Sequence, residues 1–394
     1  MGDNVAVIDH DDDFIKAGYA NPEREPPIVT PSMVRRAADA ASDGGDAGGG
    51  EMLRTIAGRR VMDWDQLEAI YSHIFYRQMG WVVGDEGPAL VTEPLFTSKA
   101  DRERLTQMMF ESFNVSGLYI AEQPVMALYG VGKVTGVAVD VGYATTDVSP
   151  VVEGAMVIPA AQRIDIGSSH VSATLERMLK ARQKGPGVGE TPSLNEAALD
   201  AVRNAVGVVA TSRETLEKLL GSGYGLGSPV EGSGGDGAVS AMTTTHTLPD
   251  GNVITVDGAA RHGIVESLFQ PKKYGLREGP GLSDALHASV MACTNDQRRA
   301  VLDAVAVSGL WAGGAGSKAG LDARVLGELE DAMTPSMKPL GTAVPEYMPD
   351  RTASFASWIG GSILAKVVFP QNQHITKVDY QENGPSVASK SRVN

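Results

Sequence analysis

The chain has 394 residues, which predicts two or three domains with an ample core. Hydrophobic residues make up 42% and charged residues 21% of the chain, a composition that excludes disorder throughout. The formal net charge of −14 argues against direct binding of nucleic acid, whose affinity comes largely from Lys and Arg on phosphates. Cys293 is the single cysteine, so no internal disulfide can form, and this fits a reducing compartment. No run is apolar enough to span a bilayer and the N-terminus lacks a signal-peptide pattern, so we expect no membrane partner.

The start of the chain predicts a β-hairpin. Residues 5–9 (VAVID) form an apolar run that ends on Asp9, and residues 14–19 resume it after a short turn. Backbone N–H groups of such turns form concave sites that hold phosphates. Residues 11–13, however, are all aspartate, where glycine and a small hydroxyl residue would be expected for that task.

A second segment repeats this arrangement. Residues 137–140 (VAVD) end on an acid, turn at Gly142, and continue as a second strand over 147–152. The repetition suggests two related lobes that face each other across a cleft.

The residues between the hairpins alternate between predicted helices and strands. Residues 37–50 are dominated by Ala, Asp, Ser and Gly, and we interpret them as a flexible loop. Asp63 is the predicted cap of an amphipathic helix that ends at Gly80, and Ser98 opens a second helix with a capping-box pattern. A short apolar strand follows each helix, and this alternation predicts an α/β lobe.

The second half of the chain has a weaker pattern. Residues 194–209 predict a helix, Asp250 and Gly251 a hairpin turn, and residues 304–309 a buried strand. Glycine-rich stretches around these elements are interpreted as inserted surface loops.

Several motifs resemble the actin superfamily. Actins carry D-N-G-S-G-x-x-K-A-G at the first turn and D-S-G-D-G-V-T at the second, where this chain has DHDDDFIKAG at 9–18 and DVGYATT at 140–146. The run WIGGSILA at 358–365 has the actin pattern unchanged. The next residues, 366–377, depart from actin and, with PEYMP at 345–349, are similar to the plant and green-algal nuclear actin-related proteins of class seven.

This resemblance implies an α/β, actin-like two-lobed fold, of the type shared by actin, heat-shock chaperones and hexokinase, with a central cleft. We expect the smaller lobe at 1–130 plus 355–394, with a shortened projecting subdomain at 32–54. The larger lobe is expected at 131–354, with Gly-rich inserted loops in 180–245 and 312–320.

The resemblance also locates a degenerate nucleotide site. Five residues match actin positions that hold nucleotide, magnesium or water: Asp9, Lys16, Gln123, Asp140 and Gly142. Asp147 replaces the family's histidine near the water. Two like charges about 4 Å apart repel by about 4 kcal/mol at an effective dielectric of about 20, so carboxylates in the phosphate loop oppose a triphosphate. We therefore expect a vestigial site without cofactor, metal or turnover, and leave weak ATP binding open.

The predicted function is a non-catalytic scaffold subunit of a nuclear chromatin-remodelling complex. The resemblance implies two partners, a helix of the motor ATPase and a companion actin-like subunit, without direct nucleic-acid contact. The helix would bind an apolar and glycine-lined set that matches the family's groove: Tyr129, Gly132, Ile363, Leu364, Val367 and Phe369. The location is expected to be the nucleus, with a cytoplasmic pool left open. The alternative is an actin-like ATP-binding cytoskeletal protein, and a weaker third option is a sugar or acetate kinase of the same fold.

Overall fold

The computed structural model describes residues 4–35, 52–182, 194–220, 243–276, 278–309, 320–333 and 352–390. The chain divides into two compact units, which we call unit 1 (Met1–Val134 with Phe355–Asn394) and unit 2 (Thr135–Ser354). The predicted subdomain at 32–54 is described only at its two ends. The predicted loops in 180–245 and 312–320 lie mostly outside the described residues, as do residues 37–50.

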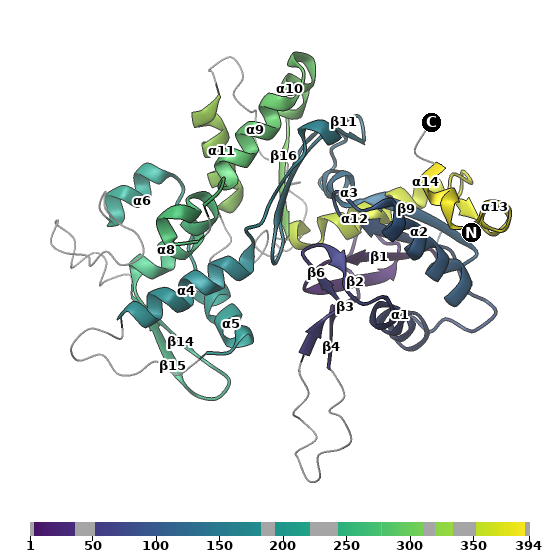
Figure 1. The fold of residues 1–394 in the computed structure, drawn as a ribbon, viewed down its shortest axis with the longest axis horizontal. Helices are drawn as coiled ribbons and strands as arrows, with labels where there is room; N and C mark the ends of the chain where they lie inside the picture. Colours follow the sequence, from purple (N-terminus) through teal and green to yellow (C-terminus); the bar gives the residue numbers. More distant parts are fainter. Residues whose placement is uncertain are drawn as a thin grey trace, which may run out of the picture. The chain divides into compact units, whose positions relative to one another are not determined.

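Unit 1 is built on a six-stranded mixed sheet (Figure 1). β1 pairs antiparallel with β2 as the predicted hairpin, and it pairs parallel with β8 on its other side. In sheet order the strands are β17 (Ile375–Thr376), β9 (Gly117–Glu122), β8 (Ala89–Glu93), β1 (Ala6–His10), β2 (Phe14–Tyr19) and β3 (Ile28–Pro31). Two small two-stranded sheets follow β3: β4 (Met33–Arg35) with β5 (Met52–Arg54), and β6 (Ile56–Ala57) with β7 (Arg60–Val61).

Both faces of this sheet are covered, which explains why its central strands are apolar throughout. Side chains alternate between the faces of a strand, so Ala6 and Ile8 join the core formed with α1 (Trp64–Ser72) and α2 (Lys99–Gln107). Val7 and Leu90 point to the opposite face, where a Cβ added at Gly361 of α12 (Thr352–Val368) would lie 3.1 and 3.2 Å from their side chains.

The helices of unit 1 begin where local sequence chemistry predicts. Asp63 caps α1 by accepting from two backbone N–H groups of the first turn, and Ser98 caps α2 by accepting from Asp101 N. Each helix continues into a π-helical segment, His73–Gln78 after α1 and Met108–Ser112 after α2, which the amphipathic pattern did not predict. The remaining helical segments of unit 1 are α3 (Gln123–Gly130), α13 (Lys377–Asn383), the 3₁₀ turn Gly384–Ser386 and α14 (Val387–Lys390).

Helices α3 and α12 touch backbone to backbone through glycine. A Cβ at Gly130 would lie 2.2 Å from the carbonyl oxygen of Ala356, and one at Gly360 would lie 1.8 Å from that of Met126. Both positions therefore require glycine. Trp358 lies between Ala356 and Gly360 in α12 and is fully buried. It donates from Nε1 to Val7 O at 3.1 Å, which connects α12 to β1.

Unit 2 repeats the hairpin-plus-parallel-strand arrangement. β10 pairs antiparallel with β11 and parallel with β16. The strands of its main sheet are β12 (Ala155–Met156), β11 (Thr146–Val152), β10 (Gly136–Val141), β16 (Val305–Gly309) and β13 (Gln162–Ile164) beside β11. A separate hairpin, β14 (Thr244–Thr247) with β15 (Val253–Val256), confirms the predicted turn at Asp250 and Gly251.

The core of unit 2 lies between its sheet and the helices packed on it. The helical segments are α4 (Ser168–Arg182), α5 (Glu196–Val206), α6 (Arg213–Leu220), α8 (Gly258–Phe269), α9 (Leu282–Ala292), α10 (Asn295–Val301), α11 (Leu321–Ala332), and the 3₁₀ turns Ile158–Ala160 and Pro271–Tyr274. Among the helices that the structure describes, none has the length and apolar character needed to cross a membrane.

Candidate functional site

The first candidate cluster lies at the end of β1, where Asp9 is almost completely buried. Its carboxylate accepts from Lys16 Nζ at 3.1 Å, from Thr92 Oγ1 at 2.6 Å and from Gln123 Nε2 at 3.1 Å. Burial alone would raise the pKa of Asp9, but the charge of Lys16 and the hydrogen bonds from Thr92 and Lys16 lower it below its ordinary value. Three of the predicted site residues, Asp9, Lys16 and Gln123, are thus brought together in one hydrogen-bonded cluster of unit 1.

Two neighbours complete this cluster. Gln123 Nε2 also donates to His10 O at 2.8 Å, while its Oε1 atom is buried without a hydrogen-bond partner. His10 Nδ1 lies 2.8 Å from the hydroxyl of Tyr71 in α1. Burial lowers the pKa of His10 to about 4, against the opposing charge of Asp9, so the ring is neutral at physiological pH.

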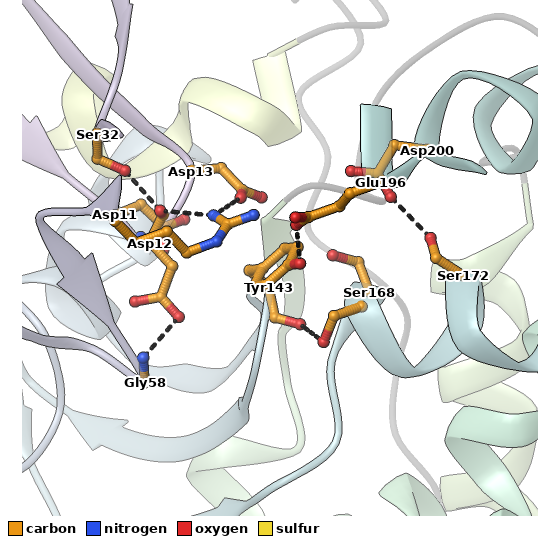
Figure 2. A network of polar contacts seen from close by, with 12 residues as sticks. Asp11, Asp12, Asp13, Ser32, Gly58, Tyr143, Ser168, Ser172, Glu196 and Asp200 are labelled. Carbon is orange, nitrogen blue, oxygen red and sulfur yellow. Dashed lines mark hydrogen bonds and ion pairs between the residues drawn. The ribbon is translucent and has the colours of Figure 1, made fainter. Parts of the chain in front are cut away.

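The acidic turn between β1 and β2 is satisfied by groups of unit 1 (Figure 2). Asp12 is fully buried, and its carboxylate accepts from Gly58 N at 3.0 Å and from Arg59 N at 2.7 Å. Asp13 Oδ1 accepts from Arg54 Nη1 at 2.6 Å. Asp11 Oδ1 accepts from Asp12 N at 2.7 Å, within the turn.

These contacts decide whether the turn suits a triphosphate. A phosphate loop offers backbone N–H groups to the ligand, but here the N–H of Asp11 donates to Phe14 O and that of Asp12 donates to Asp11 Oδ1. The neighbouring donors, Gly58 N, Arg59 N and Arg54, are directed at the turn's own carboxylates. These engaged donors oppose a triphosphate at the first turn. They add to the charge repulsion that the sequence suggested, because the N–H groups of Asp11 and Asp12 and the donors of residues 54, 58 and 59 already have acceptors within unit 1.

In the second hairpin, which lies in unit 2, an acid on the strand is paired with an arginine from a third strand. Asp140 lies opposite Asp147 in the register of β10 and β11. Arg163 of β13 binds Asp147 through two bonds, Nε to Oδ1 and Nη2 to Oδ2, each of 2.7 Å. Gly309 at the end of β16 has φ = +98°, and a Cβ there would lie 2.7 Å from Asp140 Oδ1.

The turn around Gly142 is closed by the start of α4. Ser168 N donates to Gly142 O and Ser169 N donates to Tyr143 O, each at 2.9 Å. The backbone approaches so closely that a Cβ at Gly167 would lie 2.4 Å from Tyr143 O. The ring of Tyr143 turns to Glu196 at the start of α5, to which its hydroxyl donates (Figure 2). Asp140 and Gly142 thus lie together at the turn of one hairpin, in a unit separate from that of Asp9, Lys16 and Gln123.

The predicted partner-binding residues lie in unit 1, on or next to α3 and α12. Val367 is 45% exposed and Gly132 is exposed with φ = +74°, whereas Tyr129, Ile363 and Leu364 are half-buried. Phe369 is buried, and its ring stacks on that of His374 with centroids 4.7 Å apart. Val134, which the sequence did not single out, is 58% exposed just after α3 and adds apolar surface.

Comparison with known proteins shows the family of this chain. A family model described as Actin matches residues 2–392. The chain belongs to the actin family. Actin-related protein 7 of Oryza sativa subsp. indica is 37% identical over 390 residues, covering 98% of this chain and 99% of that protein. Actin-related protein 7 of Arabidopsis thaliana is 33% identical, covering 98% of each chain. These findings confirm the predicted actin-like α/β two-lobed fold, and the resemblance to class seven as full-length homology.

Sequence reasoning missed the residues that neutralise the acids. Arg54, Gly58 and Arg59 belong to the small sheets before α1, and Arg163 belongs to β13. One signal was available, since Gly58-Arg59 between two short apolar runs is a turn pattern. Within the described residues, no group of three or more His, Cys, Asp or Glu side chains is arranged to hold a metal ion.

Proposed function

We propose that this member of the actin family is a non-catalytic scaffold subunit of a nuclear chromatin-remodelling complex. In this role it binds a helix of the motor ATPase and a companion actin-like subunit, and it contributes binding surface without hydrolysing ATP. The full-length homology to plant actin-related protein 7 supports the proposal. The net charge of −14 favours a subunit that leaves DNA contacts to its partners.

The observation that carries the proposal is the internal neutralisation of the first turn. Asp12 and Asp13 use the donors of Arg54, Gly58 and Arg59, so a triphosphate would have to displace two carboxylates from their hydrogen bonds. Displacing a buried, hydrogen-bonded carboxylate leaves unpaired polar groups, and each costs about 1–3 kcal/mol. Nucleotide affinity is reduced accordingly, and the Asp9 cluster then has a structural role.

The partner helix is proposed to bind on the apolar surface at α3 and α12. Val367 on α12 and Val134 just after α3 are its exposed apolar members, and Ile363 and Leu364 on α12 are half-buried. An amphipathic helix binds such a surface through apolar side chains at helical spacing. Phe369 is buried just after the C-terminal end of α12, where its ring stacks on that of His374.

A nucleotide test separates this proposal from the cytoskeletal alternative. A ligand at about 100 times its Kd adds about 2.7 kcal/mol to the free energy of unfolding. We expect no such stabilisation here, so millimolar Mg-ATP should leave the Tm of the full chain unchanged. An ATP-binding actin in the same buffer is the positive control. A clear rise in Tm, hydrolysis at a rate like that of actin, or polymerisation of the purified chain would refute the scaffold role.

A partner test uses two exposed valines. Val367→Glu places a charge on the proposed helix-binding surface, while Val378→Glu places the same charge on α13 at a residue that is 60% exposed. Affinity capture from nuclear extract with the first variant should lose the motor ATPase, and capture with the second should retain it. Equal retention by both variants would move the motor contact elsewhere.

A further inference from the structure

The turn between β6 and β7 has an unusual backbone. Gly58 and Arg59 both have positive φ angles, +57° and +60°. The second is a conformation that a residue with a side chain rarely adopts, and it persists where the surroundings hold it in place. Successive N–H groups in such a turn point to the same side and form a concavity that favours an anion.

The anion in that concavity is a side chain of the same unit. Asp12 Oδ2 accepts from Gly58 N at 3.0 Å, and Asp12 Oδ1 accepts from Arg59 N at 2.7 Å. Asp12 is fully buried, so both oxygens exchange hydration for these bonds. One carboxylate therefore joins the β1–β2 turn to the β6–β7 turn, 46 and 47 residues further along the chain.

Three more bonds reinforce the same junction. Arg54 Nη1 donates to Asp13 Oδ1 at 2.6 Å and to Asp12 O at 3.1 Å, and Ser32 Oγ donates to Asp12 O at 2.5 Å (Figure 2). Counting the bonds from Gly58 and Arg59, the donors to this acidic turn come from β5, from the β6–β7 turn and from the residue between β3 and β4. All of these segments precede α1, and all are held on one acidic turn.

We propose that Asp12 and Asp13 act as a built-in anion that holds the β5–β7 segment (residues 52–61) on the β1–β2 turn in the absence of any ligand. We call these contacts the acidic lock: Asp12, Asp13, Arg54, Gly58 and Arg59. The lock keeps residues 52–61 in one arrangement whether or not nucleotide is present. It goes beyond the scaffold function, because it concerns how unit 1 is held together and would stand if the chain had other partners.

The lock predicts a local effect that hydrogen exchange can measure. In the full chain without nucleotide, Asp12→Ala should speed amide exchange in residues 52–61 by at least about tenfold, because the two N–H groups lose their acceptor. Asp11→Ala is the matched control, since it removes the same charge from the same turn but only a bond within that turn. Its exchange over residues 52–61 should remain within about twofold of the unsubstituted chain.

Chemical rescue tests whether the concavity formed by the N–H groups of Gly58 and Arg59 binds an anion. Sodium formate supplies a free carboxylate and should restore at least half of the lost protection in Asp12→Ala, with sodium chloride at equal ionic strength as the salt control. Asp12→Asn keeps one acceptor oxygen, and it should give an intermediate exchange rate if the alanine variant folds poorly. Peptides from β10 in unit 2 report whether each variant is folded.

Three results would overturn the lock. Unchanged protection of residues 52–61 in Asp12→Ala would show that the contact holds nothing. An equal loss of protection over residues 52–61 in Asp11→Ala would show that the effect comes from the change in net charge and not from the Asp12 hydrogen bonds. Loss without formate rescue, spread evenly over β1, β8 and β9, would show that Asp12 serves general folding. Binding of Mg-ATP to the unsubstituted chain would instead refute the scaffold function and leave these exchange results standing.

Discussion

The two hairpins of this chain share a topology but balance their charges in different ways. In unit 1 the acid before the last residue of β1 faces a base across the ladder, Asp9 opposite Lys16. In unit 2 the corresponding acid faces another acid, Asp140 opposite Asp147, and Arg163 on the adjacent strand β13 supplies the counter-charge. The strand acid Asp9 is therefore paired within the two strands of its own hairpin, while the strand acid Asp147 depends on a third strand.

The turns differ in the same sense. The first turn, with its aspartates, takes its donors from the small sheets that precede α1. The second turn offers carbonyl oxygens instead, and these accept from the first N–H groups of α4. The same hairpin frame has thus been closed once through acids and once through carbonyls. In both cases the contacts that close the turn come from the hairpin's own unit.

Among these predictions, the substitution of Arg163 on β13 should cause the largest loss in the free energy of unfolding. Arg163→Met leaves Asp147, whose side chain is 2% exposed, without its base and opposite Asp140. Breaking a buried pair from one side costs about 3–5 kcal/mol, and because Arg163 is 17% exposed we expect a loss of about 3 kcal/mol. Denaturant unfolding followed by circular dichroism measures it.

Lys16→Met is the matched change in the first hairpin. Asp9 keeps its bonds from Thr92 and Gln123, so the expected loss is smaller, about 2 kcal/mol. The double variant Arg163→Met with Asp147→Asn should recover most of the loss in unit 2, because no charge is then stranded. A greater loss from Lys16→Met than from Arg163→Met would reverse the comparison.

The sequence predicted the parts of this picture that depend on near neighbours. The strands of both hairpins, the caps Asp63 and Ser98, and the turn at Gly251 all follow from residues within a few positions of each other. A cap needs only its own first turn of helix, and a hairpin register follows from its turn. These features were therefore readable without any knowledge of the tertiary contacts.

The arginines that pair with these acids could not be predicted from the sequence, because they lie far from the acids along the chain. Asp13 meets Arg54 across 41 residues, and Asp147 meets Arg163 across 16, through a strand pairing that hydrophobic pattern alone does not specify. Nor does a pattern of apolar residues distinguish an α-helix from the π-helical segment at His73–Gln78, because a segment of 6 residues is too short to show a different period. The predicted cluster of Asp9, Lys16 and Gln123 came from family resemblance, while the identity of its partners came from the structure.

The first hairpin should also make stability depend on pH in a way that the second does not. His10 follows Asp9 in β1, whereas the residue after Asp140 is Val141. The pKa of His10 is lowered from 6.5 to about 4, so below pH 6.5 the unfolded chain binds a proton that the folded chain does not. Stability is therefore lost as pH falls from about 6.5 to about 4, at up to about 1.4 kcal/mol per pH unit and about 3 kcal/mol in total.

His10→Gln should flatten this dependence. Urea unfolding at pH 7 and at pH 5, followed by tryptophan fluorescence, measures the difference, and Trp81 and Trp358 report on unit 1. His73→Gln is the control because that side chain is exposed. His262 and His374, whose pKa values are also lowered by burial, contribute to the slope that remains. An unchanged slope in His10→Gln would show that the acid sensitivity arises from groups other than His10.

The smallest effect is expected at the second turn. The hydroxyl of Tyr143 donates to Glu196, but Glu196 is exposed, and a hydrogen bond open to water contributes only about 0–1 kcal/mol. Tyr143→Phe should therefore leave Tm nearly unchanged, while Gly167→Ala, which would set a Cβ 2.4 Å from Tyr143 O, should lower it clearly. A large loss from Tyr143→Phe would mean that side chains hold the second turn as they hold the first. A small loss beside a large one at Gly167 would show that this turn is held by its backbone, and that carboxylate closure is confined to unit 1.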